Sequence, residues 1–224
     1  MTEPATVLTD YLLGAVLLVL AWRALRLDRH DPQAARRLWA WGFVALGLSA
    51  LAGGTWHGFS GRMEAGPAAA VWKGTVYLVG LTDLLMLAGS ASAALGRRPR
   101  AWILAAAAAK FVVYAIVMAT HVEFRYVVYD YVPSMVAILL IHAVPGSLRN
   151  DPGARSILAG LALSFVAALV QLARLAPHPH FNHNDLYHVI QIAASWVLYR
   201  GVIRLRDRRQ DPAGKEDGSC RVSF

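Results

Sequence analysis

Seven long apolar segments alternate with short polar connections along this chain of 224 residues. A helix needs about 20 apolar residues to cross the hydrocarbon core of a bilayer, and each of these segments is near that length. They lie at residues 9–27, 38–58, 70–95, 101–119, 124–145, 155–176 and 184–204. The connections contain breakers such as Asp31-Pro32 and Asp151-Pro152 and leave no room for a soluble domain. The sequence therefore predicts an all-α polytopic membrane protein, a seven-transmembrane-helix bundle.

Composition supports this prediction and adds a short tail. Apolar residues make up 57% of the chain and charged residues 16%, against about 45–50% and about 25% in soluble domains. We expect a seven-helix domain over residues 1–206 and a disordered cytoplasmic tail over 207–224, which is polar from Gln210 onward. The single cysteine, Cys220, lies in that tail and excludes an internal disulfide. Because the first ten residues contain no Lys or Arg, we expect the first segment to be retained rather than cleaved as a signal peptide.

The basic residues indicate how the helices are oriented. Of the 22 Lys and Arg residues, 17 lie at the end of the first, third, fifth or seventh segment or just after it; the others are Arg62, Lys73, Lys110, Arg125 and Arg174. Short cytoplasmic loops carry the excess of basic residues in membrane proteins. This predicts an outside N-terminus and a cytoplasmic C-terminus in a multi-pass integral membrane protein, of the plasma (inner) membrane in a bacterium. The net charge of +8 is then explained by topology and by anionic lipids, with no nucleic-acid partner.

The histidines gather on the opposite side from the basic residues. Six of the eight lie at the outer ends of helices or in outer loops, namely His57, His121, His178, His180, His183 and His188. At a rise of 1.5 Å per residue, His57 and His188 fall within about one turn of the outer boundary, and Asp130 falls about 9 Å inside it. Asp185 shares a helix face with His188, three residues away. Imidazole and carboxylate are the usual ligands of zinc, so we expect a polar, metal-binding pocket at the outer side.

Two charged residues fall near the middle of the predicted membrane. Asp83 lies in the third segment and Lys110 in the fourth. They form a buried ion pair in one interpretation, and in the other Asp83 serves the outer site as a ligand or proton acceptor. On the same helical rise, Asp83 lies roughly 8 Å deeper than the histidines.

The arrangement resembles the CREST superfamily of seven-helix membrane proteins, which includes alkaline ceramidases and the progestin and adiponectin receptors. In that family a Ser-x-x-x-His on helix two, an Asp on helix three and a His-x-x-x-His on helix seven build a zinc site. The helix-two histidine matches His57, with Gly53 at the serine position. The second helix-seven histidine matches His188, with Asn184 at the first position.

The resemblance implies a zinc-dependent hydrolase whose metal activates a water against an amide or ester bond of a membrane lipid. The metal ligands that we expect are His57, His183 and His188, and the catalytic carboxylates are drawn from Asp130, Asp185 and Asp83. The alternative is a non-enzymatic receptor or transporter that binds a ligand or a metal in the same outer cavity. A transmembrane haem cytochrome is disfavoured because the cytoplasmic side offers only His30 and His142.

The sixth segment carries small residues at four-residue spacing, Gly160, Ser164 and Ala168. Such a row lets another helix approach closely. The sequence does not distinguish a neighbour within the bundle from a helix of a second subunit.

Overall fold

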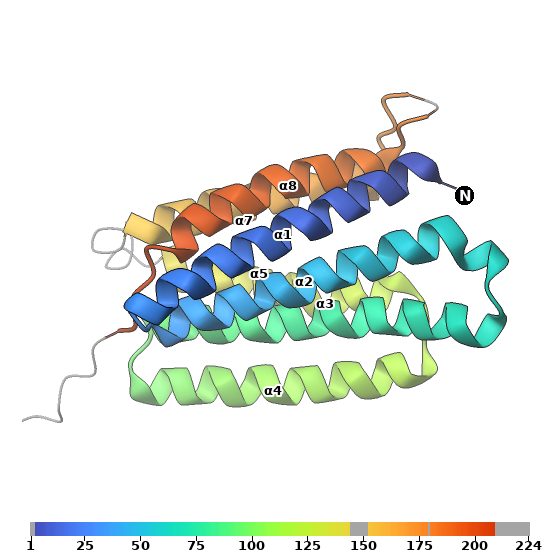
Figure 1. Ribbon diagram of the computed structural model, residues 1–224. Coiled ribbons are helices and arrows are strands. Elements are labelled where there is room, and N and C mark those ends of the chain that lie inside the picture. The colour runs from blue at the N-terminus through green and yellow to red at the C-terminus, as the bar shows by residue number, and fades with distance from the viewer. Residues whose placement is uncertain (1–2, 144–151, 179, 209–224) are drawn as a thin grey trace, which may run out of the picture.

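The computed structural model describes residues 3–143, 152–178 and 180–208. In these residues the chain forms seven long α-helices and one short 3₁₀ turn (Figure 1). The helices are α1 (Pro4–His30), α2 (Ala34–Phe59), α3 (Ala65–Ala94), α4 (Arg97–Thr120), α5 (Phe124–Ala143), α7 (Pro152–Leu172) and α8 (His183–Val202), and the turn η1 is Ser60–Arg62. The all-α prediction is confirmed, with one helix at each predicted segment.

Six of these helices are long and apolar enough to cross a membrane, and α8 falls short of that measure. The physical reason is composition, because α8 carries polar residues such as His183, Asp185, His188 and Gln191. Three of those four are buried inside the protein, so the polarity of α8 faces its neighbours. A membrane protein satisfies its polar groups internally in this way. The tail predicted for residues 207–224 lies outside the described residues from residue 209 on.

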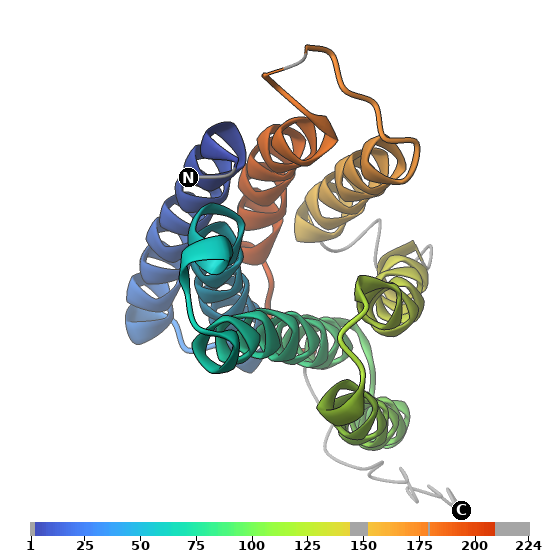
Figure 2. The same ribbon diagram turned by 90° about the vertical axis from the view of Figure 1, so that its right-hand side faces the viewer.

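Five helices surround a central cavity, and two pack against them from outside. The cavity is lined by α2, α3, α5, α7 and α8. Helix α1 packs across both α2 and α8, and α4 packs against α3 and α5 (Figure 2). Helix α4 has the lowest buried share of the six candidate spans and exposes large apolar side chains such as Trp102 and Ile116. Exposure of this kind suits a helix that faces lipid.

Several helix ends are fixed by nearby residues in the sequence, and the start of α2 is fixed by a residue far along the chain. Pro4 and Pro152 occupy the first turns of α1 and α7, where a missing N–H costs nothing. Asn182 and Asp185 form a capping box at the start of α8. The first N–H groups of α2, those of Ala34 and Ala35, each donate to the carboxylate of Asp207 at 2.8 Å. The chain after α8 therefore caps α2 and ties the last helix to the second.

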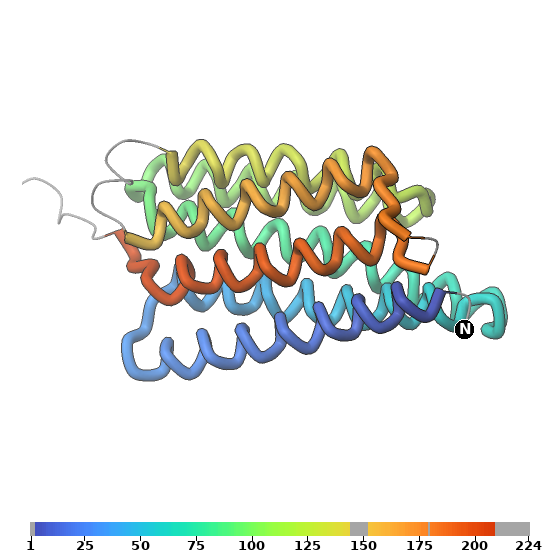
Figure 3. Tube along the Cα trace, turned by 90° about the horizontal axis from the view of Figure 1, so that it is seen from above, coloured from blue at the N-terminus to red at the C-terminus, as the bar shows by residue number. Residues whose placement is uncertain are grey.

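The two ends of the bundle differ in character. Helices α2 and α3 form a hairpin that extends beyond the neighbouring helix ends (Figures 1 and 3). At that end α1 begins, α2 ends and α8 begins, and we call it the histidine end because His57, His183 and His188 lie there. At the other end α1 finishes and α2 begins, and we call it the arginine end after residues such as Arg29, Arg36 and Arg37.

Glycines allow the closest helix contacts. A Cβ atom at Gly160 of α7 would lie 2.9 Å from the backbone nitrogen of Leu198 in α8. The small-residue row of the sixth predicted segment is thus used within one bundle. Ser164 and Ala168 of the same row line the central cavity.

We expect Gly160→Ala to destabilise the protein by about 1–3 kcal/mol, because the new methyl group overpacks against backbone that cannot turn away. Thermal unfolding in detergent measures the change. Gly74→Ala is the matched control, since a Cβ there meets no atom within 4 Å and alanine favours the helix. Equal melting temperatures for the two variants would contradict the close α7–α8 contact.

Candidate functional site

A cluster of ionisable side chains lies at the histidine end, between α1, α2 and α8. Its members are Glu3, Asp10, His57, Asp185 and His188, and we call it the histidine–carboxylate cluster. Asp10, Asp185 and His188 are buried, whereas His57 is half-buried. His57 is close enough to His188 to act on it electrostatically, as Glu3 and Asp185 are to Asp10. The structure therefore brings the two principal histidines of the sequence prediction to one place.

His188 is held through both of its ring nitrogens. Its Nε2 lies 3.1 Å from Oδ1 of Asp10, and its Nδ1 lies 3.0 Å from the hydroxyl of Thr9. Both partners belong to α1, which packs directly against α8. A neutral ring satisfies this arrangement by donating from Nε2 to the carboxylate and accepting at Nδ1. Contacts of this kind fix the tautomer and the orientation of an imidazole.

Asp185 has a structural role in the same region. Its Oδ1 accepts a hydrogen bond from the hydroxyl of Thr6 at 2.8 Å, and its Oδ2 accepts from the backbone N–H of Asn182 at 2.7 Å. The carboxylate thus caps α8 and links it to α1. Both carboxylate oxygens of Asp185 accept hydrogen bonds, so this residue holds the cluster in place structurally.

His57 reaches the cluster from the last full turn of α2. Its Nδ1 lies 3.2 Å from Oε2 of Glu3, just before α1 begins. The ring also packs edge-on against Trp56, whose indole lies 4.8 Å, between ring centroids, from that of Trp72 in α3. Aromatic side chains therefore flank the exposed side of this histidine.

Asp10 has a buried oxygen without a partner. Oδ1 of Asp10 contacts His188, while Oδ2 has no hydrogen bond to any residue in the described part of the chain. A Cβ atom at Gly53 would lie 4.0 Å from each of these oxygens. The position at which the CREST pattern has serine thus faces the Asp10 carboxylate. Gly54, the next residue, allows α1 to approach, since a Cβ there would lie 2.8 Å from Cβ of Asp10.

Asp83 and Asp130 belong to a separate group. Lys110 of α4 lies between them, with its Nζ 2.6 Å from Oδ2 of Asp83 in α3 and 2.5 Å from Oδ1 of Asp130 in α5. The same ammonium donates to the backbone carbonyl of Asp130 at 3.0 Å. We call these three residues the ion triad. Of the two interpretations of Asp83, the structure has the ion pair, and it adds Asp130 to it.

The sequence places Asp130 about 9 Å inside the outer boundary and Asp83 roughly 8 Å deeper than the histidines. In the structure the two acids lie at a similar depth, because one ammonium contacts both. The cause is the α2–α3 hairpin, whose helix α3 starts at Ala65 and protrudes at the histidine end (Figure 3). Counting residues from a helix start gives the depth of a residue in the membrane only when all helices start at the same level.

His183 is the first residue of α8. In the described part of the chain no hydrogen bond or ion pair joins it to His57 or His188. It follows the capping residue Asn182, so its backbone starts the helix while His188 lies more than one turn further in. His121, by contrast, bonds to its own helix end through Nδ1 and Val117.

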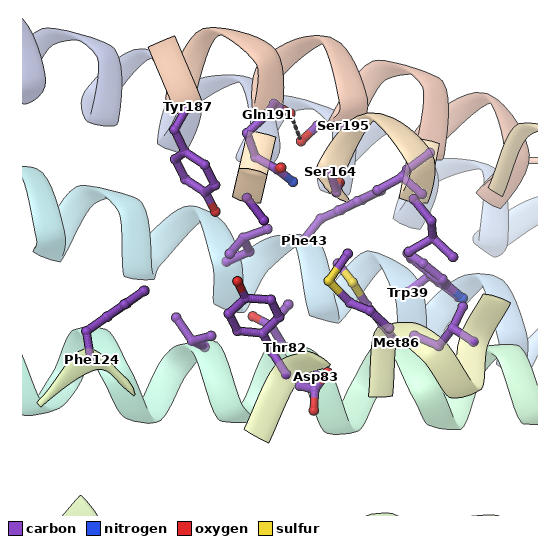
Figure 4. Close-up of a pocket in the computed structure, with 18 residues that line it drawn as sticks. Trp39, Phe43, Thr82, Asp83, Met86, Phe124, Ser164, Tyr187, Gln191 and Ser195 are labelled. Atoms are coloured by element: carbon purple, nitrogen blue, oxygen red, sulfur yellow. Dashed lines mark hydrogen bonds between the residues drawn. The ribbon is translucent and has the colours of Figure 1, made fainter. Parts of the chain in front are cut away.

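The central cavity of about 140 Å³ begins next to the histidine–carboxylate cluster. Tyr187, beside His188, lines it together with Gln191 and Ser195 further along the same face of α8 (Figure 4). Asp83 lies on the far side of the cavity from them (Figure 4). Aromatic, methionine and aliphatic side chains form most of the remaining wall. A dry cavity of about 150 Å³ holds a benzene-sized ligand, and this one is of similar size.

The residues of the cluster fit zinc by donor type. Two imidazoles and a carboxylate are a common ligand set for a catalytic zinc, and the unpartnered Oδ2 of Asp10 is a buried atom that a cation would satisfy. Their arrangement fits less well. Within residues 3–143, 152–178 and 180–208, no group of three or more His, Cys, Asp or Glu is arranged to hold a metal ion. His57 and His188 would have to release Glu3 and Asp10 and turn toward a shared centre.

Sequence reasoning missed the contribution of α1. Thr6, Thr9 and Asp10 supply the partners of Asp185 and His188, and none of them was singled out. A signal was present, because an acid and two threonines interrupt the apolar pattern at the start of the first span. Polar residues at that position are equally typical of a helix end exposed to solvent. Only the packing of α1 against α8 shows that they are buried hydrogen-bonding partners.

Comparison with known proteins gives one match. The model of a family of unknown function, DUF6962, covers residues 5–207, so the chain belongs to this family. No curated protein matches the chain, and no solved structure does. The matched range includes both the histidine–carboxylate cluster from Asp10 on and the ion triad.

We expect Gly53→Ser to be tolerated and Gly54→Ser to destabilise the protein. The new Cβ at position 53 makes ordinary contacts, and its hydroxyl can reach the unpartnered Asp10 oxygen, whereas the Cβ at position 54 collides with α1. Thermal unfolding in detergent compares the pair, with an expected difference of about 1–3 kcal/mol. A destabilised Gly53→Ser together with a stable Gly54→Ser would contradict the α1–α2 packing described here.

Proposed function

We propose that this member of DUF6962 is a zinc-dependent membrane hydrolase that cleaves an amide or ester bond of a lipid at the outer side of the membrane. The observation that carries the proposal is the meeting of His57, His188 and the half-satisfied carboxylate of Asp10 at one end of the bundle. Ionisable groups within membrane spans mark functional sites by default.

The protein residues have separable tasks under this proposal. His57, His188 and Asp10 are the groups that would hold the metal, which when bound supplies a water of lowered pKa and polarises a carbonyl group. Thr9 keeps the His188 ring oriented through Nδ1, as outer partners of metal-binding histidines do. Glu3, which contacts His57, is the exposed carboxylate placed to accept a proton and pass it to solvent. The apolar cavity beside Tyr187 offers space for part of an acyl chain.

A second proposal, a receptor or transporter without turnover, is favoured by a specific observation. The cluster is arranged as paired contacts rather than around a metal, and the cavity lies at the centre of the bundle. In this alternative the cavity binds a small ligand and the histidine–carboxylate cluster closes its entrance.

Metal content separates the two proposals. If the hydrolase proposal holds, purified protein contains about one zinc per chain, and His57→Ala and His188→Ala each lower this occupancy more than ~tenfold because each removes a ligand. Elemental analysis of protein in lipid nanodiscs measures the occupancy. His121→Ala is the matched control, a histidine at the same end that bonds to its own helix.

Zinc retained by both ligand variants, or absent from the wild type, would refute the metal site and favour the binding protein. Zinc in the wild type without hydrolysis of any lipid amide or ester in the nanodiscs would retain the site and reject the enzyme.

We further propose that α8 crosses the membrane with the six more apolar helices, which places the histidine end outside and the arginine end in the cytoplasm. Basic residues at the arginine end support this orientation by the positive-inside rule. The packing of α8 between α1 and α7 supports the seventh span, because its polar residues then face protein rather than lipid.

The natural cysteine tests the orientation. Since Cys220 follows the last span, a membrane-impermeant maleimide added to intact bacterial host cells should leave it unlabelled, and labelling should appear on permeabilisation. The control is Met63→Cys in a Cys220→Ser background, at the α2–α3 connection, which should react in intact cells. Labelling of Cys220 in intact cells would reverse or abolish the proposed topology.

A further inference from the structure

The ion triad is an unbalanced set of charges among candidate membrane spans. Asp83, Lys110 and Asp130 lie in α3, α4 and α5, all three of which are apolar enough to span a membrane. Both aspartates are buried, at 6% exposure. In the described residues, Lys110 is the one cation that contacts either carboxylate. Two carboxylates and one ammonium leave a net charge of −1, which is costly in this environment.

The neighbours of the triad do not compensate that charge. Tyr114 of α4 interacts electrostatically with both carboxylates and with Tyr77 of α3, but the two phenols donate to backbone carbonyls, of Val76 and Ala115. Ser134 of α5 is near Asp83. The described residues of α2, α7 and α8 place no charged side chain in contact with the triad.

One atom of the triad is left unsatisfied. Oδ2 of Asp130 is buried and has no hydrogen-bond partner among the described residues, and the Asp130 side chain is only 4% exposed. A buried acceptor on an ionised carboxylate loses its hydration without compensation. A metal cation is a poor remedy here, because the Lys110 ammonium already occupies the position between both carboxylates.

We propose that the ion triad binds one exchangeable proton within the membrane. A proton from water forms an O–H bond on one of the two carboxylates, most directly at Oδ2 of Asp130, and the three residues together become neutral. Release returns the proton to water and restores the net charge of −1. Asp83 also lines the central cavity, as does Tyr187, the neighbour of His188. The site is independent of metal at the histidine–carboxylate cluster.

Infrared difference spectroscopy tests the proposal on the full-length protein in nanodiscs, with chelator present so that metal plays no part. The pH is stepped from ~4 to ~10, and the carbonyl band of protonated carboxyl groups is recorded in H₂O and D₂O. We expect Asp83→Asn and Asp130→Asn each to remove the contribution of one carboxyl group. Each leaves one carboxylate for one ammonium, so both variants are neutral without a bound proton and should fold.

We expect Lys110→Met to increase the carbonyl band relative to the wild type. Without the cation both carboxyl groups should bind protons, which adds the contribution of one more group. The control is Asp28→Asn, because the buried carboxylate of Asp28 is satisfied by the N–H of Gln33 and by Arg37 and should leave the band unchanged. If the band has the same intensity in the wild type, Asp83→Asn and Asp130→Asn, the proposal is overturned, whatever the stability of Lys110→Met.

Discussion

Polar groups inside an apolar bundle must find their partners within the protein, and this constraint decides how the helices face one another. Helix α8 is the long helix that falls short of the apolar character of a membrane span in the described part of the chain. Its buried histidine, aspartate and glutamine require neighbours that can bond to them. Helix α1 supplies Thr6, Thr9 and Asp10, and so lies against α8. The same requirement joins α3, α4 and α5, because the buried carboxylates of Asp83 and Asp130 share the half-buried ammonium of Lys110.

The two polar groups divide the bundle into two kinds of site. The histidine–carboxylate cluster lies at one end, partly open through His57 and Glu3, and contains the residue types that bind metals or exchange protons with solvent. The ion triad lies deeper, on the opposite side of the central cavity from α8 (Figure 4). Its lysine contacts one oxygen of each carboxylate, Oδ2 of Asp83 and Oδ1 of Asp130. Of the residues in these two groups, Asp83 lines the cavity, and Tyr187, the neighbour of His188, lines it from α8.

The resemblance to the CREST superfamily is strongest in the position of the site and weakest in its acid. The family pattern takes its aspartate from helix three, whereas Asp83 here is bound by Lys110. The carboxylate that reaches His188 comes from α1 instead, and it faces Gly53, at the position of the missing serine. The proposed metal site would therefore take its acid from α1 rather than from the third helix.

The sequence by itself determined the helical segments, since apolar runs of membrane-spanning length and their Pro-containing connections specify helices through local physics. It also indicated that His57 and His188 belong together, because both were placed by counting from the same side. Only the tertiary structure decided which acid reaches which base. Asp10, Asp83 and Asp130 are equivalent by residue type, and the protrusion of the α2–α3 hairpin shifts the depth of Asp83 by an amount that residue counting does not contain. The capping of α2 by Asp207 was likewise decided by the tertiary structure, because contacts between distant segments follow from how the helices pack. Helix packing depends on how side-chain shapes fit between elements, and the residue pattern within one element does not specify that fit.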